Sequence, residues 1–241
     1  MLKERDEFMK YQAILFDLDG TLLNTLDDLA DGVNHVLMTQ GWPLRTVEEI
    51  RRFVGNGIRK LMERAVPAGT PTEELESAFL EFKVYYSSHC RIKTVPYRGI
   101  PELLAVLRNA GIPLGVISNK NEEAVKTLIS DFFPGVFSAV VGQSPQRAPK
   151  PAPDMLLYGV DLLGFRVKDC LYVGDSEVDK ATADNACMDC ASVTWGFRDR
   201  ELLRSLSPKY LFEDPGDMFV LLDKKSFRSR NASSRCFDAG E

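Results

Sequence analysis

The sequence predicts an α/β fold: a doubly wound, mostly parallel Rossmann-like sheet into which an α-helical domain is inserted. Short apolar runs that stop abruptly at polar residues alternate with stretches of helical periodicity, a pattern typical of parallel strands joined by helices. Between the first two of these runs, residues 24–95 show helical periodicity and little strand signal. That stretch is too long for one crossover connection, so it indicates an inserted helical domain.

The first predicted strand covers residues 13–16 and ends at Asp17-Leu18-Asp19-Gly20-Thr21. Its uninterrupted apolar character suits a parallel strand buried on both faces, and Gly20 lets the backbone turn sharply after it. Two carboxylates so close together raise each other's pKa, which a bound divalent cation or a shared proton would relieve. Oxygen ligands of this kind suit Mg²⁺. An ordinary Asp-Gly turn is the alternative interpretation.

The inserted domain, residues 24–95, is predicted from apolar residues at helical spacing on two faces. These residues are Leu26, Leu29, Val33, Val36 and Leu37 on the first face, and Leu75, Ala78, Phe79, Phe82, Tyr85 and Tyr86 on the second. Because the domain leaves and re-enters beside the first strand, it can cover a site there and exclude water from it. Residues 9–23 and 96–223 then form the sheet-containing core.

Three further apolar runs, residues 113–117, 139–141 and 170–173, repeat the design of the first, and residues 191–195 and 210–212 are also predicted strands. In an open parallel sheet, ligands bind outside the carboxyl ends of the strands. The polar residues that follow these runs are therefore expected to gather at one edge of the sheet.

The second acidic segment, Gly174-Asp175-Ser176-Glu177-Val178-Asp179, follows the run at 170–173. If Asp175 faces Asp17 across neighbouring strand ends, the two can hold one Mg²⁺, with the main-chain carbonyl of Asp19 as a third protein ligand. Asp175 could instead cap the helix that follows.

Two more segments offer groups toward an anion. Ser118-Asn119 supplies a hydroxyl, an amide and backbone donors at the end of the run 113–117, and Lys150 supplies a positive charge just before a predicted helix. Taken singly, these would be a turn and a solvated lysine. Their common position at strand ends of one sheet favours a binding role.

The composition disfavours several classes of protein. The 30 Lys and Arg residues against 35 Asp and Glu give a net charge of -5 without a basic stretch, so no nucleic-acid partner is expected. No apolar stretch approaches the roughly 20 residues that span a bilayer, so we expect a cytoplasmic protein without a membrane partner. The odd number of cysteines, 5, suggests reduced thiols, and Cys187-x-x-Cys190 lacks a second pair that would complete a metal site.

The two ends of the chain carry no predicted structure. Residues 1–8 and the polar, serine-rich residues 224–241 are expected to be disordered tails, although the second could also serve as a basic docking arm.

With these motifs the chain resembles the haloacid dehalogenase-like phosphatase superfamily, and within it the phosphoglycolate phosphatase-like group. The match covers about residues 11–222, and the insertion, with Val54-Gly55-Asn56-Gly57, resembles the family's helical cap and its substrate-facing loop. Cys187 stands where relatives often have glycine, which should affect packing. The four motifs occur in order as Asp17-Leu18-Asp19-Gly20-Thr21, Ser118-Asn119, Lys150-Pro151 and Gly174-Asp175-x-x-x-Asp179.

The resemblance implies a division of roles. Asp17 would attack phosphorus, while Asp19 would protonate the leaving oxygen and then activate the water that cleaves the phospho-aspartate. Asp179 would orient Lys150 or a metal-bound water. The groups expected to neutralise or surround the phosphoryl oxygens are Mg²⁺, Lys150, Ser118, the backbone amides of Leu18 and Asn119, and the turn at Gly20 and Thr21, where Thr21 supports the turn or hydrogen-bonds Asp17.

Specificity is expected in the cap, because the core contacts only the phosphoryl group. Gly55-Asn56-Gly57 could let the backbone approach the substrate, and Arg59 or Lys60 could bind a second anionic group. Exposed helix cations are the alternative interpretation of Arg59 and Lys60.

The function predicted from these motifs is Mg²⁺-dependent hydrolysis of a small phosphate monoester, by a monomer or a homodimer. The leading substrate is 2-phosphoglycolate, with pyrophosphate or a sugar phosphate behind it. A phosphomutase of the beta-phosphoglucomutase kind and a non-catalytic regulatory protein are the alternatives. A dehalogenase is disfavoured because it needs neither Asp19 as acid-base nor Mg²⁺.

Overall fold

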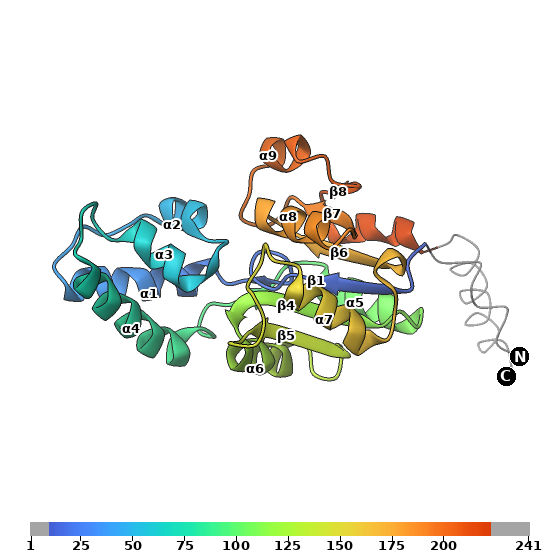
Figure 1. Cartoon of the computed structure of the whole chain (residues 1–241), viewed down its shortest axis with the longest axis horizontal. Coiled ribbons are helices and arrows are strands. Elements are labelled where there is room, and N and C mark those ends of the chain that lie inside the picture. The colour runs from blue at the N-terminus through green and yellow to red at the C-terminus, as the bar shows by residue number, and fades with distance from the viewer. Residues whose placement is uncertain (1–9, 223–241) are drawn as a thin grey trace, which may run out of the picture.

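Six parallel strands form the main sheet of residues 10–222, the part of the chain that the computed structural model describes (Figure 1). Their order is β5-β4-β1-β6-β7-β8, so the first strand lies inside the sheet and the connections run outward on both sides of it. This confirms the predicted doubly wound α/β fold. The strands are β1 Ala13–Phe16, β4 Leu114–Asn121, β5 Ala139–Gln143, β6 Cys170–Gly174, β7 Asp189–Val193 and β8 Tyr210–Phe212.

The register of the central strands brings their carboxyl ends to one level. Phe16 at the end of β1 lies opposite Val116 in β4 and Val173 in β6. The backbone N–H of Asp17 donates to the carbonyl of Val173 over 2.8 Å. The polar residues that follow these positions therefore meet at one edge of the sheet.

Helices cover both faces of the sheet, as β1 shows. Ile14 and Phe16 pack with α5 (Ile100–Asn109), α6 (Glu122–Phe132) and the 3-10 helix η2 (Pro215–Leu221). Ala13 and Leu15 pack on the other face, where α7 (Asp154–Leu163) and α8 (Glu177–Asn185) lie. All four residues of β1 are buried, as expected of a strand covered on both faces. The remaining elements, η1 (Val167–Asp169) and α9 (Arg200–Ser205), belong to connections.

Two predicted strands differ most in their bounds, while β5 and β6 run two residues and one residue further than predicted. The strand predicted at 191–195 covers Asp189–Val193: it begins two residues earlier, and Thr194 and Trp195 lie beyond its end. The Thr194 N–H still donates to the carbonyl of Phe212 in β8 (3.0 Å), and the indole N–H of Trp195 donates to the carbonyl of Thr21. The strand predicted at 113–117 continues to Asn121, where it pairs with Gln143 after an irregularity in the ladder.

A separate helical lobe lies beside the sheet, at the left of Figure 1, and contains α1 (Leu26–Thr39), α2 (Val47–Phe53), α3 (Gly57–Ala65) and α4 (Thr72–His89). It has a hydrophobic core of its own, to which both predicted apolar faces contribute. The two-stranded antiparallel pair of β2 (Leu23–Asn24) and β3 (Val95–Pro96) joins it to the sheet. We call this lobe the cap, and we propose residues 24 and 95 as its limits.

The base of the cap is fixed by a buried aspartate. Asp28 in α1 accepts hydrogen bonds from the backbone N–H groups of Lys93 (2.9 Å) and Thr94 (2.8 Å), and from the Thr94 hydroxyl (2.7 Å). These bonds tie the segment that leaves the cap to the helix that enters it.

The expected tails, residues 1–8 and 224–241, lie outside the described residues. Of the five cysteines, the four that are described are free thiols, and Cys187 adopts a positive φ of 53°, a conformation that favours glycine. Among the described helices, none combines the length and the apolar character needed to cross a membrane.

Candidate active site

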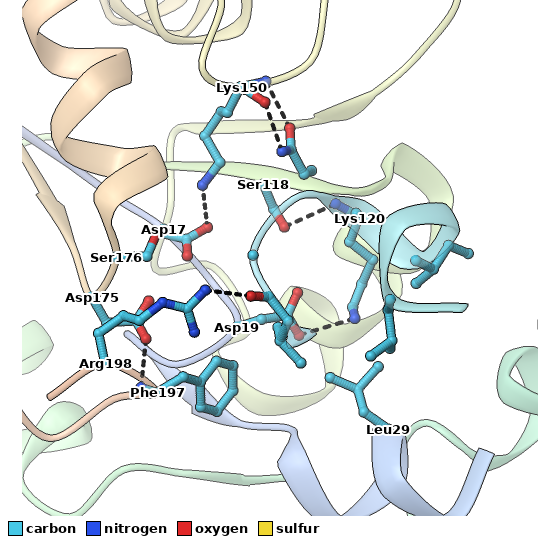
Figure 2. A pocket seen from close by; sticks show the side chains of 16 residues that line it. Asp17, Asp19, Leu29, Ser118, Lys120, Lys150, Asp175, Ser176, Phe197 and Arg198 are labelled. Carbon is cyan, nitrogen blue, oxygen red and sulfur yellow. Dashed lines mark hydrogen bonds and ion pairs between the residues drawn. The ribbon is translucent and has the colours of Figure 1, made fainter. Parts of the chain in front are cut away.

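A pocket opens where the carboxyl ends of β1, β4 and β6 face the cap (Figure 2). We call its two sides the core side and the cap side. Gly57, at the start of α3, comes close to the core side, since a Cβ there would lie 3.8 Å from the carbonyl oxygen of Asn119. The cap side consists of Leu29, Val54, Gly55, Gly57, Ile58 and Leu61, and the core side includes Asp17, Asp19, Ser118, Asn119, Lys120, Lys150, Asp175 and Ser176.

Lys150 lies at the centre of the core side. Its ammonium donates to Asp17 Oδ1 (2.7 Å), Asp179 Oδ1 (2.7 Å) and the Tyr172 hydroxyl (3.1 Å). Burial disfavours the charged form, but the two carboxylates outweigh it and raise the pKa of Lys150 above its ordinary value. Asn119 orients the Lys150 backbone, because it accepts from the N–H (2.7 Å) and donates to the carbonyl (3.0 Å).

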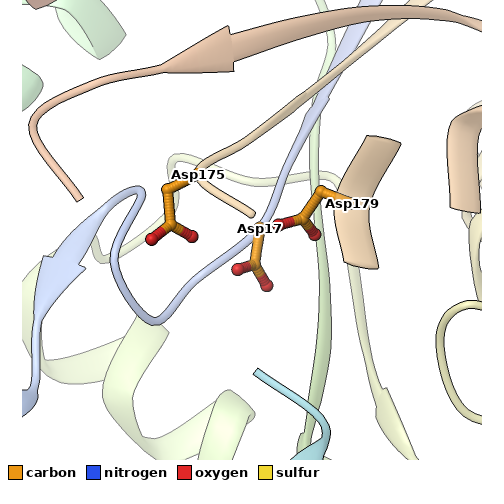
Figure 3. A group of neighbouring side chains, drawn as sticks. All are labelled: Asp17, Asp175 and Asp179. Carbon is orange, nitrogen blue, oxygen red and sulfur yellow. The ribbon is translucent and has the colours of Figure 1, made fainter. Parts of the chain in front are cut away.

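Asp17, Asp175 and Asp179 form a buried acidic cluster, in which one carboxylate oxygen from each lies within 4.8 Å of the others (Figure 3). Burial and the neighbouring Asp179 raise the pKa of Asp17 well above its usual range, against the opposing charge of Lys150. The same two causes raise the pKa of Asp175 to about 7. Three carboxylates beside one lysine leave excess negative charge, so a divalent cation fits this cluster.

The hydrogen bonds indicate which members of the cluster could hold that cation. Both oxygens of Asp179 are engaged: Oδ1 accepts from Lys150 and from the Tyr172 hydroxyl (3.0 Å), and Oδ2 accepts from the hydroxyl (2.6 Å) and the N–H (3.2 Å) of Ser176. For Asp175, the structure shows one such bond, from the Phe197 N–H to Oδ2 (2.6 Å). Asp17 and Asp175 are therefore the better ligands, and Asp179 is the residue that positions Lys150.

Glycines allow Asp175 to lie against the turn after β1. A Cβ at Gly20, which has a φ of 93°, would lie 2.3 Å from Asp175 Oδ2. A Cβ at Gly196 would lie 2.4 Å from the same atom. Neither position can carry a side chain without moving the carboxylate, which explains the glycine after the second acid of the first motif.

Asp19 faces away from the acidic cluster. Its Oδ1 accepts from the ammonium of Lys120 (2.9 Å) and from the hydroxyl of Thr25 (2.7 Å). Lys120 is buried and also donates to the hydroxyl of Tyr86 in the cap (3.1 Å). Burial disfavours the charged form of Lys120, but Asp19 and Tyr86 outweigh this and raise the pKa of Lys120 above its ordinary value. Sequence analysis missed this residue, although it directly follows Ser118-Asn119.

Arg198 is a second pocket residue that sequence analysis missed. It lies in the loop after β7, pairs with Glu177 (2.7 Å), and donates to the carbonyls of Val54 (2.5 Å) and Arg51 (3.1 Å) at the end of α2. Arg51 in turn reaches Asp199 over 3.0 Å. These bonds hold the cap loop around Gly55 against the core, and no local sequence pattern indicates them.

Three predicted substrate-binding residues lie elsewhere than expected. Thr21 does not bond Asp17: its buried hydroxyl has no hydrogen-bond partner among the described residues, and the Thr21 carbonyl accepts from Trp195 (3.0 Å). Asn56 and Arg59 do not line the pocket. Arg59 lies on the outer face of α3, where it pairs with Glu76 and with Glu63 (3.3 Å). The position of Arg59 follows from helical geometry. Ile58 and Leu61, three residues apart on one face of α3, line the pocket, so Arg59 lies on another face.

A parallel sheet with buried aspartates and a lysine at its central strand ends, beneath an inserted helical cap, defines the chain as an α/β enzyme with a capped acidic site. The profile of the haloacid dehalogenase-like hydrolase family matches residues 14–193. The chain belongs to this family, which confirms the resemblance inferred from its motifs.

Among its relatives are phosphoglycolate phosphatases. Phosphoglycolate phosphatase 1 of Pseudomonas aeruginosa is 31% identical over 88% of this chain and 79% of that protein. The phosphoglycolate phosphatase of Neisseria meningitidis is 35% identical over 80% of this chain and 84% of that protein. The crystal structure of a candidate phosphoglycolate phosphatase from Lactobacillus delbrueckii is 34% identical, with a TM-score of 0.84 over 89% of this chain and 99% of that one.

Proposed function

We propose that this chain is a Mg²⁺-dependent phosphatase that hydrolyses 2-phosphoglycolate through a phospho-aspartate on Asp17. The coarser part, hydrolysis of a phosphoric monoester, follows from the family and from relatives at 31% to 35% identity. The observation that supports the finer part is the buried cluster of Asp17, Asp175 and Asp179, which shares one lysine.

Asp17 is the proposed nucleophile. Its Oδ1 is held by Lys150, which leaves Oδ2 to attack phosphorus. The attacking carboxylate must be ionised, and burial together with Asp179 opposes this. Lys150 favours the ionised form, and Mg²⁺ held by Asp17, Asp175 and the main-chain carbonyl of Asp19 would add positive charge against the developing negative charge of the phosphoryl group.

Asp19 is the proposed acid-base. Lys120 and Thr25 both engage its Oδ1, so Oδ2 is left to give a proton to the leaving oxygen and then to take one from water. The hydroxyl of Ser118, the backbone N–H groups of Leu18 and Asn119, and Lys150 would bind the phosphoryl oxygens. Of the predicted substrate-facing loop, Val54, Gly55 and Gly57 line the pocket, whereas Asn56 does not.

The apolar cap side favours a small ester over a sugar phosphate. Leu29, Val54, Ile58 and Leu61 offer no side-chain hydrogen bonds to sugar hydroxyls, and leaving such hydroxyls unpaired in a closed pocket costs binding energy. This supports a phosphatase over a phosphomutase of sugars. With this activity we propose a cytoplasmic monomer or homodimer. The net charge of -5 supports the absence of a nucleic-acid partner.

A substrate panel tests the proposal. Purified full-length chain is incubated with 2-phosphoglycolate, glucose 1-phosphate and pyrophosphate, with Mg²⁺ or with EDTA, and released phosphate is measured. We expect the highest kcat/KM on 2-phosphoglycolate and no turnover in EDTA. Phosphate release that persists in EDTA would contradict the metal requirement, and isomerised sugar phosphate without released phosphate would identify a phosphomutase.

A further inference from the structure

Lys120 is a buried cation of the pocket to which the proposed hydrolytic steps give no task. It is 8% exposed, it lines the pocket, and it lies two residues after Ser118 in β4. An ammonium has three donors, and the structure gives this one two acceptors among the described residues, Asp19 and Tyr86. One donor therefore remains for a ligand.

The other cations of the pocket are engaged differently. Lys150 directs all three of its donors to Asp17, Asp179 and Tyr172. The guanidinium of Arg198 is held between Glu177 and the backbone carbonyls at the end of α2. Lys120 is thus the pocket cation that combines a remaining donor with a position next to the proposed acid-base.

We propose that Lys120 is the specificity-determining residue that binds a carboxylate carried by the leaving group of the substrate. This inference rests on the proposed function and identifies the feature of the substrate that the enzyme selects: a carboxylate attached to the ester-bearing carbon.

The position of Lys120 relative to Asp19 fits such a substrate. Its Nζ lies 2.9 Å from Asp19 Oδ1, and a leaving oxygen hydrogen-bonded to Asp19 would lie about 2.8 Å from that carboxylate. The ammonium and the leaving oxygen are then close neighbours. A carboxylate that begins two bonds from the ester oxygen, as in 2-phosphoglycolate, can turn toward the ammonium and accept a charge-assisted hydrogen bond.

The cap fixes the lysine in this position. The hydroxyl of Tyr86 in α4 accepts from Lys120 over 3.1 Å, and the Lys120 ammonium lies 4.9 Å from the centre of the Tyr86 ring. Tyr86 belongs to the apolar core of the cap, so its position is set by packing and not by the substrate. The cap therefore contributes to specificity by orienting a core residue.

Two substrates and two variants test this inference. 2-Hydroxyethyl phosphate has the two-carbon skeleton of 2-phosphoglycolate, with an uncharged hydroxymethyl group in place of the carboxylate. Lys120→Met removes the ammonium and keeps an unbranched side chain that extends as far as the lysine Cε. We expect this variant to lower the ratio of kcat/KM for 2-phosphoglycolate to kcat/KM for 2-hydroxyethyl phosphate by about 10- to 100-fold, as loss of a hydrogen bond to a charged group predicts.

The ratio is independent of how much of the variant is correctly folded. Tyr86→Phe, which conserves volume and leaves the ammonium without its orienting hydroxyl, should lower the same ratio by about threefold. Lys126→Met is the matched control, because Lys126 is an exposed lysine of α6 paired with Glu122, and its ratio should equal that of the wild type.

The outcomes separate this inference from the proposed function. If Lys120→Met lowers kcat/KM equally for both substrates, Lys120 acts through Asp19 and the inference is overturned. The proposed phosphatase activity is unaffected by that result. If the ratio is unchanged in both variants, the carboxylate is bound elsewhere and the inference is again overturned. If the wild type hydrolyses other monoesters but not 2-phosphoglycolate, the proposed substrate itself is wrong and the inference falls with it.

Discussion

The two sides of the pocket treat charge in opposite ways. On the core side, the side chains of Asp17, Lys150 and Asp179 are at most 9% exposed, and all three are joined by hydrogen bonds. On the cap side the pocket is lined by aliphatic residues, and the cations of α3 lie on its outer surface.

This contrast indicates that the core side carries the reactive charged groups, whereas the cap side encloses the pocket. Buried charges interact strongly because little water screens them, so the loss of one partner leaves another charge unpaired. Aliphatic cap residues exclude water and shape the pocket, and their effects should be smaller and graded. Single changes on the core side should therefore have large effects, and changes on the outer face of the cap should have none.

The largest effect is expected for Asp17→Asn. The amide has the shape of the carboxylate but is a poor nucleophile, so kcat should fall by at least about a thousandfold, the loss of more than about 4 kcal/mol of transition-state stabilisation. Mg²⁺-dependent release of phosphate from 2-phosphoglycolate measures it. Residual turnover above about one per cent of the wild type would contradict a nucleophilic role and weaken the contrast between the two sides.

Asp175→Asn tests the acidic cluster through stability. In metal-free protein the pKa of Asp175 is about 7, above its ordinary value of 3.8. Between these values the folded state binds more protons than the unfolded state, so Asp175 makes the folded protein less stable as the pH rises through this range. In EDTA we expect the melting temperature to fall from pH 5 to pH 8, and Asp175→Asn to reduce this fall by several degrees.

Mg²⁺ gives the same variant a second readout. Binding to the folded state should raise the melting temperature of the wild type at pH 8 more than at pH 5, because the carboxylates are then ionised. Asp175→Asn should lose most of this increase. Asp184→Asn, which alters an exposed carboxylate of α8, the helix that follows Asp175, and whose side chain pairs with Lys180, should keep it. Equal stabilisation of both variants by Mg²⁺ would place the cation elsewhere.

Arg198→Ala tests the contact that joins the two sides. Without the guanidinium, the carbonyls of Arg51 and Val54 lose their donor, and the cap loop at Gly55 is no longer held against the core. We expect kcat/KM for 2-phosphoglycolate to fall by about tenfold, a loss between those of the core side and the outer cap. Arg200→Ala, which removes an exposed pair with Glu213 nearby, is the control. Unchanged kcat/KM in both variants would show that the cap loop needs no such support.

The sequence predicted the core side because its residues share one local rule. Asp17, Ser118 and Asp175 each follow a buried apolar run, and parallel strands bring such positions together whatever the rest of the chain does. The same rule predicted the sheet itself, with shifts of a few residues in the strand bounds, as at residues 194 and 195, which lie beyond the end of β7, and at the end of β4, which continues to Asn121.

Contacts between the cap and the core could not be predicted in this way. Lys120 donates to the Tyr86 hydroxyl, and Arg198 donates to the Val54 carbonyl. Both hydrogen bonds depend on how the cap lies over the sheet. No periodicity encodes that placement, and Tyr86 is indistinguishable in the sequence from an ordinary apolar-face residue. The same limit applies to Arg59, since the direction a helix turns toward a distant strand end depends on tertiary packing.

Arg59→Gln should have the smallest effect. Its guanidinium pairs with Glu76 and Glu63 on the outer face of α3 and lies over the Phe79 ring, away from the residues that line the pocket. The Glu76 partner raises the pKa of Arg59, so the residue is a charged surface cation whose interactions water screens. We expect kcat and KM for 2-phosphoglycolate to stay within about twofold of the wild type.

Glu76→Gln is the matched control for Arg59→Gln, because it breaks the same ion pair and leaves the arginine charge in place. A KM that rises more than about tenfold in Arg59→Gln but not in Glu76→Gln would mean that the arginine leaves its surface partners to bind the substrate. Charge recognition would then lie on the cap side as well. If both variants behave as the wild type, the recognition of charge is confined to the core side, where burial makes it strong.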